Sequence, residues 1–230
     1  GRSGFYDSIG ALRDVGQNHM LQMMALVAMD IPATLETEAI RERRQAVLEA
    51  LSSRTSQDIA SHARRGQYEG YLDDVNASSS KTETYFELTA FIDSKHWQDV
   101  PFFLKSGKAL HENKSEINIY FKRDNGGKQN VLRFRIQPNE AIEILFWFKK
   151  PGFDHKIESK ELVFKYHDSP EAQKLPDAYE RVLHDAINGD QTLFSSTGEV
   201  TASWKFITPI IEAWQSLPLY KYKKGNYGPD

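Results

Sequence analysis

A histidine and an aspartate in one predicted helix are the residues of this sequence whose types and spacing best suit proton transfer. The stretch RDVGQNHMLQMM, residues 13–24, contains Asp14 and, five positions later, His19. A histidine near its unperturbed pKa of about 6.5 accepts a proton at neutral pH, so His19 is a candidate general base. A lone histidine on an apolar helix face is more often a core residue with one satisfied ring nitrogen, and on the residues alone both interpretations stay open.

The helix that carries these residues is predicted from Tyr6 to about Met29, with Asp7 as its N-cap and the Asp-Ile-Pro sequence at 30–32 as its end. At about 100° per residue, His19 falls on one broad apolar stripe and Asp14 on the opposite side, about 140° away. The stripe consists of Ile9, Leu12, Val15, His19, Met23, Leu26 and Val27. A straight α-helix therefore keeps Asp14 and His19 apart, so that they contact different parts of one ligand or are unrelated. Gly16, one turn before His19, leaves room for a ligand or permits close packing.

Two further stretches are rich in polar groups that suit an anionic or polar ligand. Three lysines gather around Gly107 in FFLKSGKALHENKSE: Lys105, Lys108 and Lys114. Lysines near an exposed turn bind an anion such as a phosphate as point charges, although a charged loop is the common alternative. The stretch RFRIQPNE, residues 133–140, places Arg133, Arg135 and Gln137 on one sheet face. This face is either the solvated side of a sheet or the floor of a polar site.

The elements that must position these residues follow an α+β plan. We predict helices at 6–29, 36–51, 175–189 and 200–214, and strands at 84–93, 115–122, 131–137, 141–150 and 161–167. Residues 52–80 read as one or two strands followed by a loop. Pro176 and Asp177 begin the third helix, Gly189 ends it, and Pro209 bends the last. Residues 123–130, RDNGGKQN, form a hairpin connection. The prediction is a large, mostly antiparallel sheet with helices packed on one face.

Composition excludes several classes of function. The 230 residues carry a net charge of −3 and no cysteine, so we expect no nucleic acid partner, no disulfide and no thiolate metal site. We find no metal-ligand spacing and no glycine-rich phosphate loop. No apolar run approaches the roughly 20 residues of a membrane span, so no membrane is expected. The first ten residues do not resemble a signal peptide and read as the interior of a longer chain. The absence of cysteine is compatible with a cytoplasmic location.

Six motifs taken together resemble one family, glucose-6-phosphate dehydrogenase. They occur in that family's order and are RDVGQNHMLQMMALVAMD, GYLDD, VPFFLKSGKAL, RIQPNEAI, KLPDAYERVLHDAINGD and SWKFITPI. The resemblance covers nearly all of this chain and only the C-terminal part of the family's usual protein. We therefore expect residues 1–230 to form the family's C-terminal domain as one domain, without the N-terminal nucleotide-binding domain.

The resemblance implies roles for four residues. His19 matches the base that removes the proton from the C1 hydroxyl of glucose 6-phosphate while hydride passes to NADP, which gives 6-phosphoglucono-lactone. Asp14 matches an aspartate that binds sugar hydroxyls, and Lys108 matches a lysine of the substrate site. Gln137 matches a glutamine that contacts substrate in some members. NADP would be bound mainly by the N-terminal domain, so the 230-residue chain alone is expected to be inactive.

Departures from the family pattern concern anion contacts. Asn113 stands where several members have a basic residue beyond Lys108, which puts a phosphate contact in doubt. Animal-type members bind a second NADP on the large sheet, for which Lys105, Lys114 and Arg135 would be remnants. Because Glu143 stands where a neutral aromatic is expected, we do not predict this second site.

Two alternatives stay open beside the dehydrogenase. The first is a non-catalytic sugar-phosphate-binding or dimerisation module, and the second is a dehydrogenase for another hexose or hexose phosphate. The resemblance implies a homodimer or homotetramer formed through the sheet, and the apolar residues Phe146, Trp147 and Phe148 suit such a surface or an ordinary core.

Overall fold

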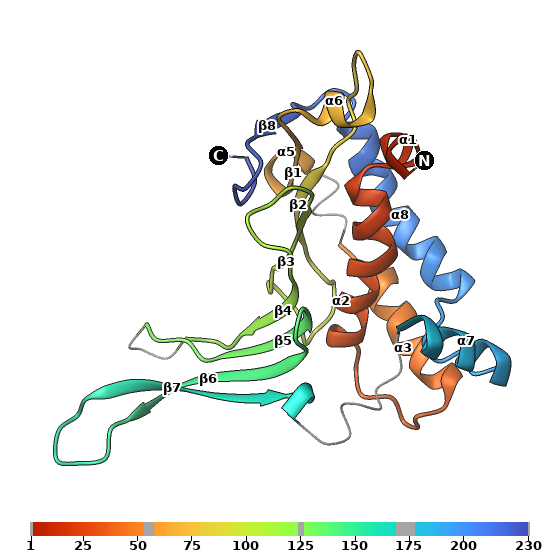
Figure 1. The fold of residues 1–230 in the computed structure, drawn as a ribbon. Coiled ribbons are helices and arrows are strands. Elements are labelled where there is room, and N and C mark those ends of the chain that lie inside the picture. The colour runs from red at the N-terminus through yellow and green to blue at the C-terminus, as the bar shows by residue number, and fades with distance from the viewer. Residues whose placement is uncertain (1, 53–57, 124–126, 169–177, 230) are drawn as a thin grey trace. The chain divides into compact units, whose positions relative to one another are not determined.

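The computed structural model in Figure 1 describes residues 2–52, 58–123, 127–168 and 178–229. The chain forms two compact units, one made of residues 1–111 and 184–230 and the other of residues 112–183. Helices and mostly antiparallel strands occur together, which confirms the α+β class. The strands are divided between two four-stranded sheets, one in each unit.

The sheet of the first unit has the strand order β3-β2-β1-β8. Its strands are β1 (Ala63–Tyr68), β2 (Tyr85–Ala90), β3 (Phe102–Gly107) and β8 (Tyr220–Tyr222). The pairs β1–β2 and β2–β3 are antiparallel, whereas β1–β8 is parallel. β2 follows the predicted alternation, since Phe86, Leu88 and Ala90 are buried. β3 was not recognised from the sequence, although it ends at Gly107 and so places Lys108 at the sheet edge.

The N-terminal helix differs from the prediction, because it is three segments. α1 (Arg2–Ile9) ends before Gly10, whose φ of +81° breaks the helix. η1 (Leu12–Met20) follows as a π-helix, in which backbone hydrogen bonds span five residues, and it continues into α2 (Leu21–Ala28). α2 ends at the predicted place, with Met29 extended. Asp7 is not an N-cap; it lies inside α1, where its carboxylate accepts hydrogen bonds from the Tyr71 and Ser80 hydroxyls.

The predicted apolar stripe was also wrong, because it assumed α-helical turns throughout. The buried residues of these segments are Tyr6, Gly10, Ala11, Leu12, Gly16, Gln17, Leu21, Met24, Ala25 and Ala28. They recur at spacings of four and five through η1, as the wider turn requires. His19 and Leu26, both assigned to the stripe, are exposed.

The other helices of the first unit are α3 (Thr37–Glu49), α5 (Ile59–His62), α6 (Tyr71–Val75) and α8 (Thr197–Ala213). In Figure 1, α2 lies on one side of β1, β2 and β3, and α8 packs against η1 and α3. Arg44 of α3 is buried and pairs with Glu199 of α8 at 2.8 Å. Glu199 also forms a capping box with Ser196. Pro209 lies inside α8, and the bend predicted there stays a prediction.

The second unit contains the antiparallel sheet β4-β5-β6-β7. Its elements are β4 (Ser115–Tyr120), β5 (Val131–Gln137), β6 (Ala141–Lys149), β7 (Ile157–Lys165) and the short helix η2 (Tyr166–Asp168). The antiparallel pairing of β4 with β5 confirms the predicted hairpin. α7 (Ala178–Asn188) crosses the boundary of the units and is followed by Gly189 at a φ of +71°, as predicted for its stop. Pro176 and Asp177, predicted to begin this helix, lie outside the described residues.

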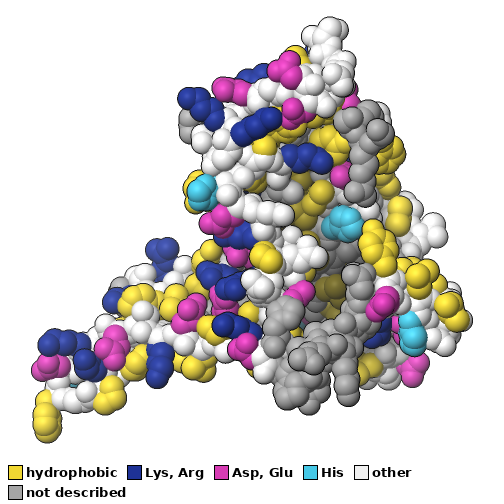
Figure 2. Space-filling model, in the orientation of Figure 1, with side chains coloured by type: hydrophobic (Ala, Val, Ile, Leu, Met, Phe, Trp, Pro, Cys, Tyr) yellow, Lys and Arg dark blue, Asp and Glu magenta, His cyan; other side chains and the backbone are white. Residues whose placement is uncertain are grey.

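Surface charge on the face in Figure 2 is mixed: Lys and Arg side chains are interspersed with Asp and Glu side chains. None of the described helices is long and apolar enough to cross a bilayer. In the same described part of the chain, no group of three or more His, Asp or Glu side chains is placed to hold a metal ion.

Candidate active site

The π-helical geometry of η1 brings Asp14 and His19 to one face of the helix. The backbone N–H of Leu21 donates to the carbonyl of Gly16, five residues earlier. In such a helix residues five positions apart stand on successive turns, as residues four apart do in an α-helix. The prediction that Asp14 and His19 lie about 140° apart was therefore wrong, because it applied the α-helical period.

His19 is exposed on this face, and Asp14 is partly buried. Among the described residues, none is hydrogen-bonded to the imidazole of His19, so both ring nitrogens are free to meet a ligand. An exposed imidazole is not the sealed core histidine that was the alternative interpretation. To act as a base, His19 needs a further group that fixes the tautomer and the orientation of its imidazole ring.

Gly16 does not provide the space for a ligand. A Cβ atom at Gly16 would lie 2.8 Å from Leu12 Cδ1 and 2.9 Å from Phe86 Cζ. Gly16 is therefore needed for close packing of η1 on β2, which was the second of the two interpretations. This packing sets the distance between η1 and β2.

Lys108 follows β3 and is held in place by its backbone. Its N–H donates to the Thr84 carbonyl at 2.8 Å, and its carbonyl accepts from the buried Tyr222 hydroxyl at 2.7 Å. Its ammonium group lies over the ring of Tyr6, with Nζ 3.8 Å from the ring centroid. The side chain is exposed, so the ammonium group is available to an anion.

Tyr6 interacts with Lys108 and is affected by the charge of Asp14, and it was not identified from the sequence. Its ring is buried beneath the Lys108 ammonium group. Burial raises the pKa of the Tyr6 hydroxyl far above its usual value, and negative charge on Glu83 and Asp14 adds to the effect. Lys108 thus lies over the Tyr6 ring, and the charge of Asp14 affects the Tyr6 hydroxyl. The sequence signal that could have identified Tyr6 is its position as an aromatic residue one turn before Gly10, the glycine that interrupts the helix.

Gln137 lies at the exposed end of β5, in the second unit. In the first unit Asp14 and His19 lie on η1 and Lys108 directly follows β3, and the membership of these residues and of Gln137 in one site stays a prediction.

Three cationic residues in or next to the second sheet, Lys114, Arg133 and Arg135, are already paired with carboxylates. Arg133 and Arg135 both pair with the buried carboxylate of Glu143, Arg133 Nη1 at 2.7 Å from Glu143 Oε2. Lys114 Nζ lies 2.8 Å from the Glu112 carboxylate and 3.4 Å from that of Glu116. Acceptors within the protein therefore neutralise the groups that a phosphate would need.

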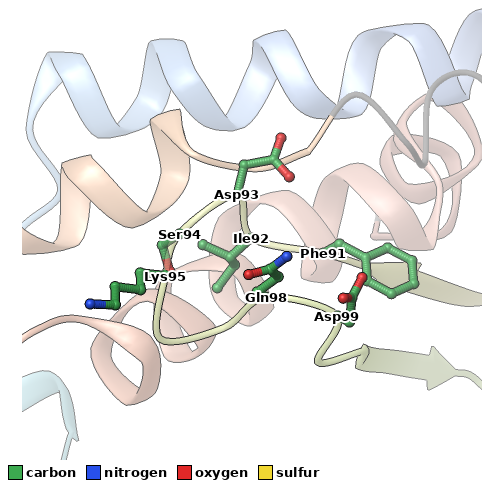
Figure 3. A pocket seen from close by; sticks show the side chains of 7 residues that line it. All are labelled: Phe91, Ile92, Asp93, Ser94, Lys95, Gln98 and Asp99. Carbon is green, nitrogen blue, oxygen red and sulfur yellow. The ribbon is translucent and has the colours of Figure 1, made fainter.

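A hollow of about 380 Å³ lies elsewhere, in the connection from β2 to β3. Its lining comes from residues 91–95 with Gln98 and Asp99, and Figure 3 shows the Asp93 carboxylate directed away from Gln98 and Asp99. Since its carboxylates do not converge and it contains no predicted site residue, we place the candidate site on η1 and at the end of β3.

The whole chain, residues 1–230, matches the family model described as glucose-6-phosphate dehydrogenase, C-terminal domain. Glucose-6-phosphate 1-dehydrogenase of Borreliella burgdorferi is 38% identical over 248 residues, which cover 100% of this chain and 52% of that protein. The protein of that name from Caenorhabditis elegans is 37% identical, with 100% of this chain and 47% of that protein covered.

Two solved structures share the fold. A glucose-6-phosphate dehydrogenase in complex with its substrate glucose-6-phosphate has a TM-score of 0.88 and 35% identity, over 100% of this chain and 50% of that one. Glucose-6-phosphate 1-dehydrogenase from Mycobacterium avium has a TM-score of 0.84 and 29% identity, and the match covers 100% of this chain and 49% of that one. The chain spans about half the length of the relatives that it matches.

Proposed function

We propose a function from the premise that this chain belongs to the glucose-6-phosphate dehydrogenase family, whose C-terminal domain it matches over its whole length. The proposal is that the chain is the substrate-binding half of an oxidoreductase that oxidises glucose 6-phosphate at C1 to 6-phosphoglucono-lactone, the entry to the pentose phosphate pathway. A nicotinamide cofactor, proposed to be NADP, accepts the hydride.

The observation that carries the proposal is the arrangement of three groups in the first unit. An exposed imidazole and a carboxylate share one face of η1, and an ammonium group lies over the ring of Tyr6, whose hydroxyl is affected by the charge of that carboxylate. An acceptor for a proton, an acceptor for hydroxyl groups and a cation for a phosphate are the groups that a sugar phosphate requires.

In this mechanism, His19 accepts the proton of the C1 hydroxyl as the C1 hydrogen leaves as hydride, and the C1–O bond becomes the lactone carbonyl. Asp14 accepts hydrogen bonds from sugar hydroxyls and so orients C1 toward His19. Lys108 binds the phosphate as a point charge, and Gln137 is included as a further substrate contact on the family resemblance alone. Orientation by Asp14 and Lys108 makes proton removal effectively intramolecular.

The cofactor, proposed to be NADP, would be bound mainly by the N-terminal domain of the full-length protein, so we assign none of its contacts to this chain. His19 also lacks an orienting partner among the described residues. We therefore expect the 230-residue chain alone to bind glucose 6-phosphate without turning it over.

The same proposal includes a cytoplasmic homodimer or homotetramer formed through the sheet of the second unit. Several large apolar side chains of β7 and η2 are exposed there: Ile157, Leu162, Val163, Phe164 and Tyr166. By contrast Phe146, Trp147 and Phe148 of β6 are partly buried.

The test is an absorbance assay at the nicotinamide band with the product of the whole reading frame that contains this chain. Glucose 6-phosphate is compared with glucose and other hexose phosphates, each with NADP and with NAD. Reduction of NADP with glucose 6-phosphate supports the proposal. Binding of glucose 6-phosphate without reduction of either cofactor would favour the non-catalytic module, and preference for another hexose would reassign the substrate.

A further inference from the structure

The junction between α1 and η1 leaves backbone donors without helical partners. Gly10 adopts a φ of +81°, so the helix is interrupted directly before Ala11. The first N–H groups of a helix have no acceptor within the helix and need one from outside. The residues that follow this junction lead directly into Asp14.

Glu83, two residues before β2, supplies acceptors for two of these N–H groups. The Ala11 N–H donates to the Glu83 backbone carbonyl at 3.0 Å, and the Leu12 N–H donates to Glu83 Oε1 at 3.0 Å. A Cβ atom at residue 10 would lie 2.3 Å from Glu83 Oε1. Gly10 therefore permits both the break in the helix and the approach of the carboxylate.

Burial raises the pKa of the Glu83 carboxylate, and the hydrogen bond from the Leu12 N–H and the charges of Arg13 and Arg65 act against this rise. Arg65 of β1 itself donates to the carbonyls of Leu217 and Pro218. The positive end of a helix also favours a carboxylate at this place. Glu83 is thus held from the sheet side and bonded to the first turn of η1.

We propose that Glu83 is a positioning residue that fixes the first turn of η1 and thereby sets the place of the substrate-binding carboxylate of Asp14. This inference rests on the proposed function, in which Asp14 binds sugar hydroxyls. Asp14 lies two residues after Leu12, whereas His19 lies seven residues after it, in the part of η1 that Gly16 packs against Phe86. Loss of the Glu83 bond therefore displaces Asp14 more than His19.

Two substitutions distinguish the effect of the hydrogen bond between Leu12 and Glu83 from the effect of the negative charge of Glu83. Glu83→Leu keeps most of the side-chain volume and removes the acceptor, whereas Glu83→Gln removes the charge and keeps an oxygen that accepts from Leu12. Glu87→Leu is the matched control, because Glu87 lies four residues after Glu83, on β2, and bonds to Arg64 and Tyr85 instead of η1.

The first measurement needs no substrate. Amide hydrogen exchange of residues 10–20 is compared with that of α3 in each variant. We expect exchange at Leu12 to be faster by on the order of tenfold or more in Glu83→Leu, and unchanged in Glu83→Gln and Glu87→Leu. Equal acceleration in η1 and α3 would indicate general destabilisation and overturn the proposal.

The second measurement is steady-state kinetics of the full-length protein with glucose 6-phosphate, well below the unfolding temperature. We expect Glu83→Leu to raise KM roughly tenfold with a smaller change in kcat, and Glu83→Gln to restore KM. Loss of kcat at unchanged KM, or failure of Glu83→Gln to restore KM, would overturn the proposal. If the wild-type protein does not oxidise glucose 6-phosphate, the proposed function fails while the exchange experiment still tests the role of Glu83 in η1.

Discussion

Asp14 and His19 lie on one face of η1, one turn apart, because the hydrogen bonds of this helix span five residues. In an α-helix the same two residues would point in different directions. The wider turn therefore lets one ligand meet a carboxylate and an imidazole at once. π-helical turns are rare in proteins, and those that occur are often found at functional sites, which agrees with this placement.

Removal of the Asp14 charge tests its contact with the sugar. We expect Asp14→Asn to raise KM for glucose 6-phosphate by roughly tenfold to a hundredfold, since a hydrogen bond to a charged group is worth about 1.5–3 kcal/mol. Steady-state kinetics measure this effect, with Glu42→Gln, a charge removed from the exposed side of α3, as the control. An unchanged KM in Asp14→Asn would show that Asp14 belongs to a solvated helix face.

Lys108 is tested by the difference between a phosphorylated and an unphosphorylated sugar. Lys108→Met should raise KM for glucose 6-phosphate by on the order of tenfold and leave turnover of glucose, which has no phosphate, unchanged from that of the wild type. It should also flatten the dependence of KM on ionic strength, because the screened charge is gone. Lys105→Met serves as the control, since Lys105 lies on β3 beside Tyr85 rather than over Tyr6. Equal losses with both sugars would mean that Lys108 supports the fold instead of binding phosphate.

Gly16 is predicted to be essential for packing. In Gly16→Ala the new methyl group meets Leu12 and Phe86 at less than 3 Å, so the free energy of unfolding should fall by about 1–3 kcal/mol. Thermal unfolding measures this as a decrease of roughly 2–4 °C in Tm for each kcal/mol. Thr201→Ala, at an exposed position of α8, should change stability by less than about 0.5 kcal/mol. A Gly16→Ala variant as stable as the wild type would argue against this close contact.

Asp7 should make stability depend on pH in the acid range. Burial would raise the pKa of Asp7, but hydrogen bonds from Ser80, Tyr71 and Thr82 outweigh this effect and lower it. A lowered folded-state pKa stabilises the fold above the unfolded value of about 3.9, and that stability is lost as pH falls through the folded value. In urea unfolding, the wild type should exceed Asp7→Asn in stability at pH 7, and the difference should shrink below about pH 4. A difference that is constant between pH 7 and pH 3 would contradict the lowered pKa.

The sequence predicted the elements better than it predicted the site. The strands β2, β4, β5, β6 and β7 were recognisable because apolar and polar residues alternate along them, and in β2 the apolar residues Phe86, Leu88 and Ala90 are buried. The division of the helix at Gly10 and the π-turns of η1 were not, since both depend on contacts with β2 that lie more than sixty residues away in the chain. For the same reason Tyr6 and Glu83 were missed, and Gly16 was open to two interpretations until Phe86 was seen beside it.

The role of His19 is tested most directly by replacing it with asparagine in the full-length protein. We predict that His19→Asn lowers kcat with glucose 6-phosphate by about 10²–10⁴-fold, because a general base is removed, and leaves the Kd for glucose 6-phosphate nearly unchanged. His96→Asn, a substitution of an exposed histidine that pairs with Asp30, should retain wild-type kcat. Near-normal turnover by His19→Asn would contradict the assignment of His19 as the base.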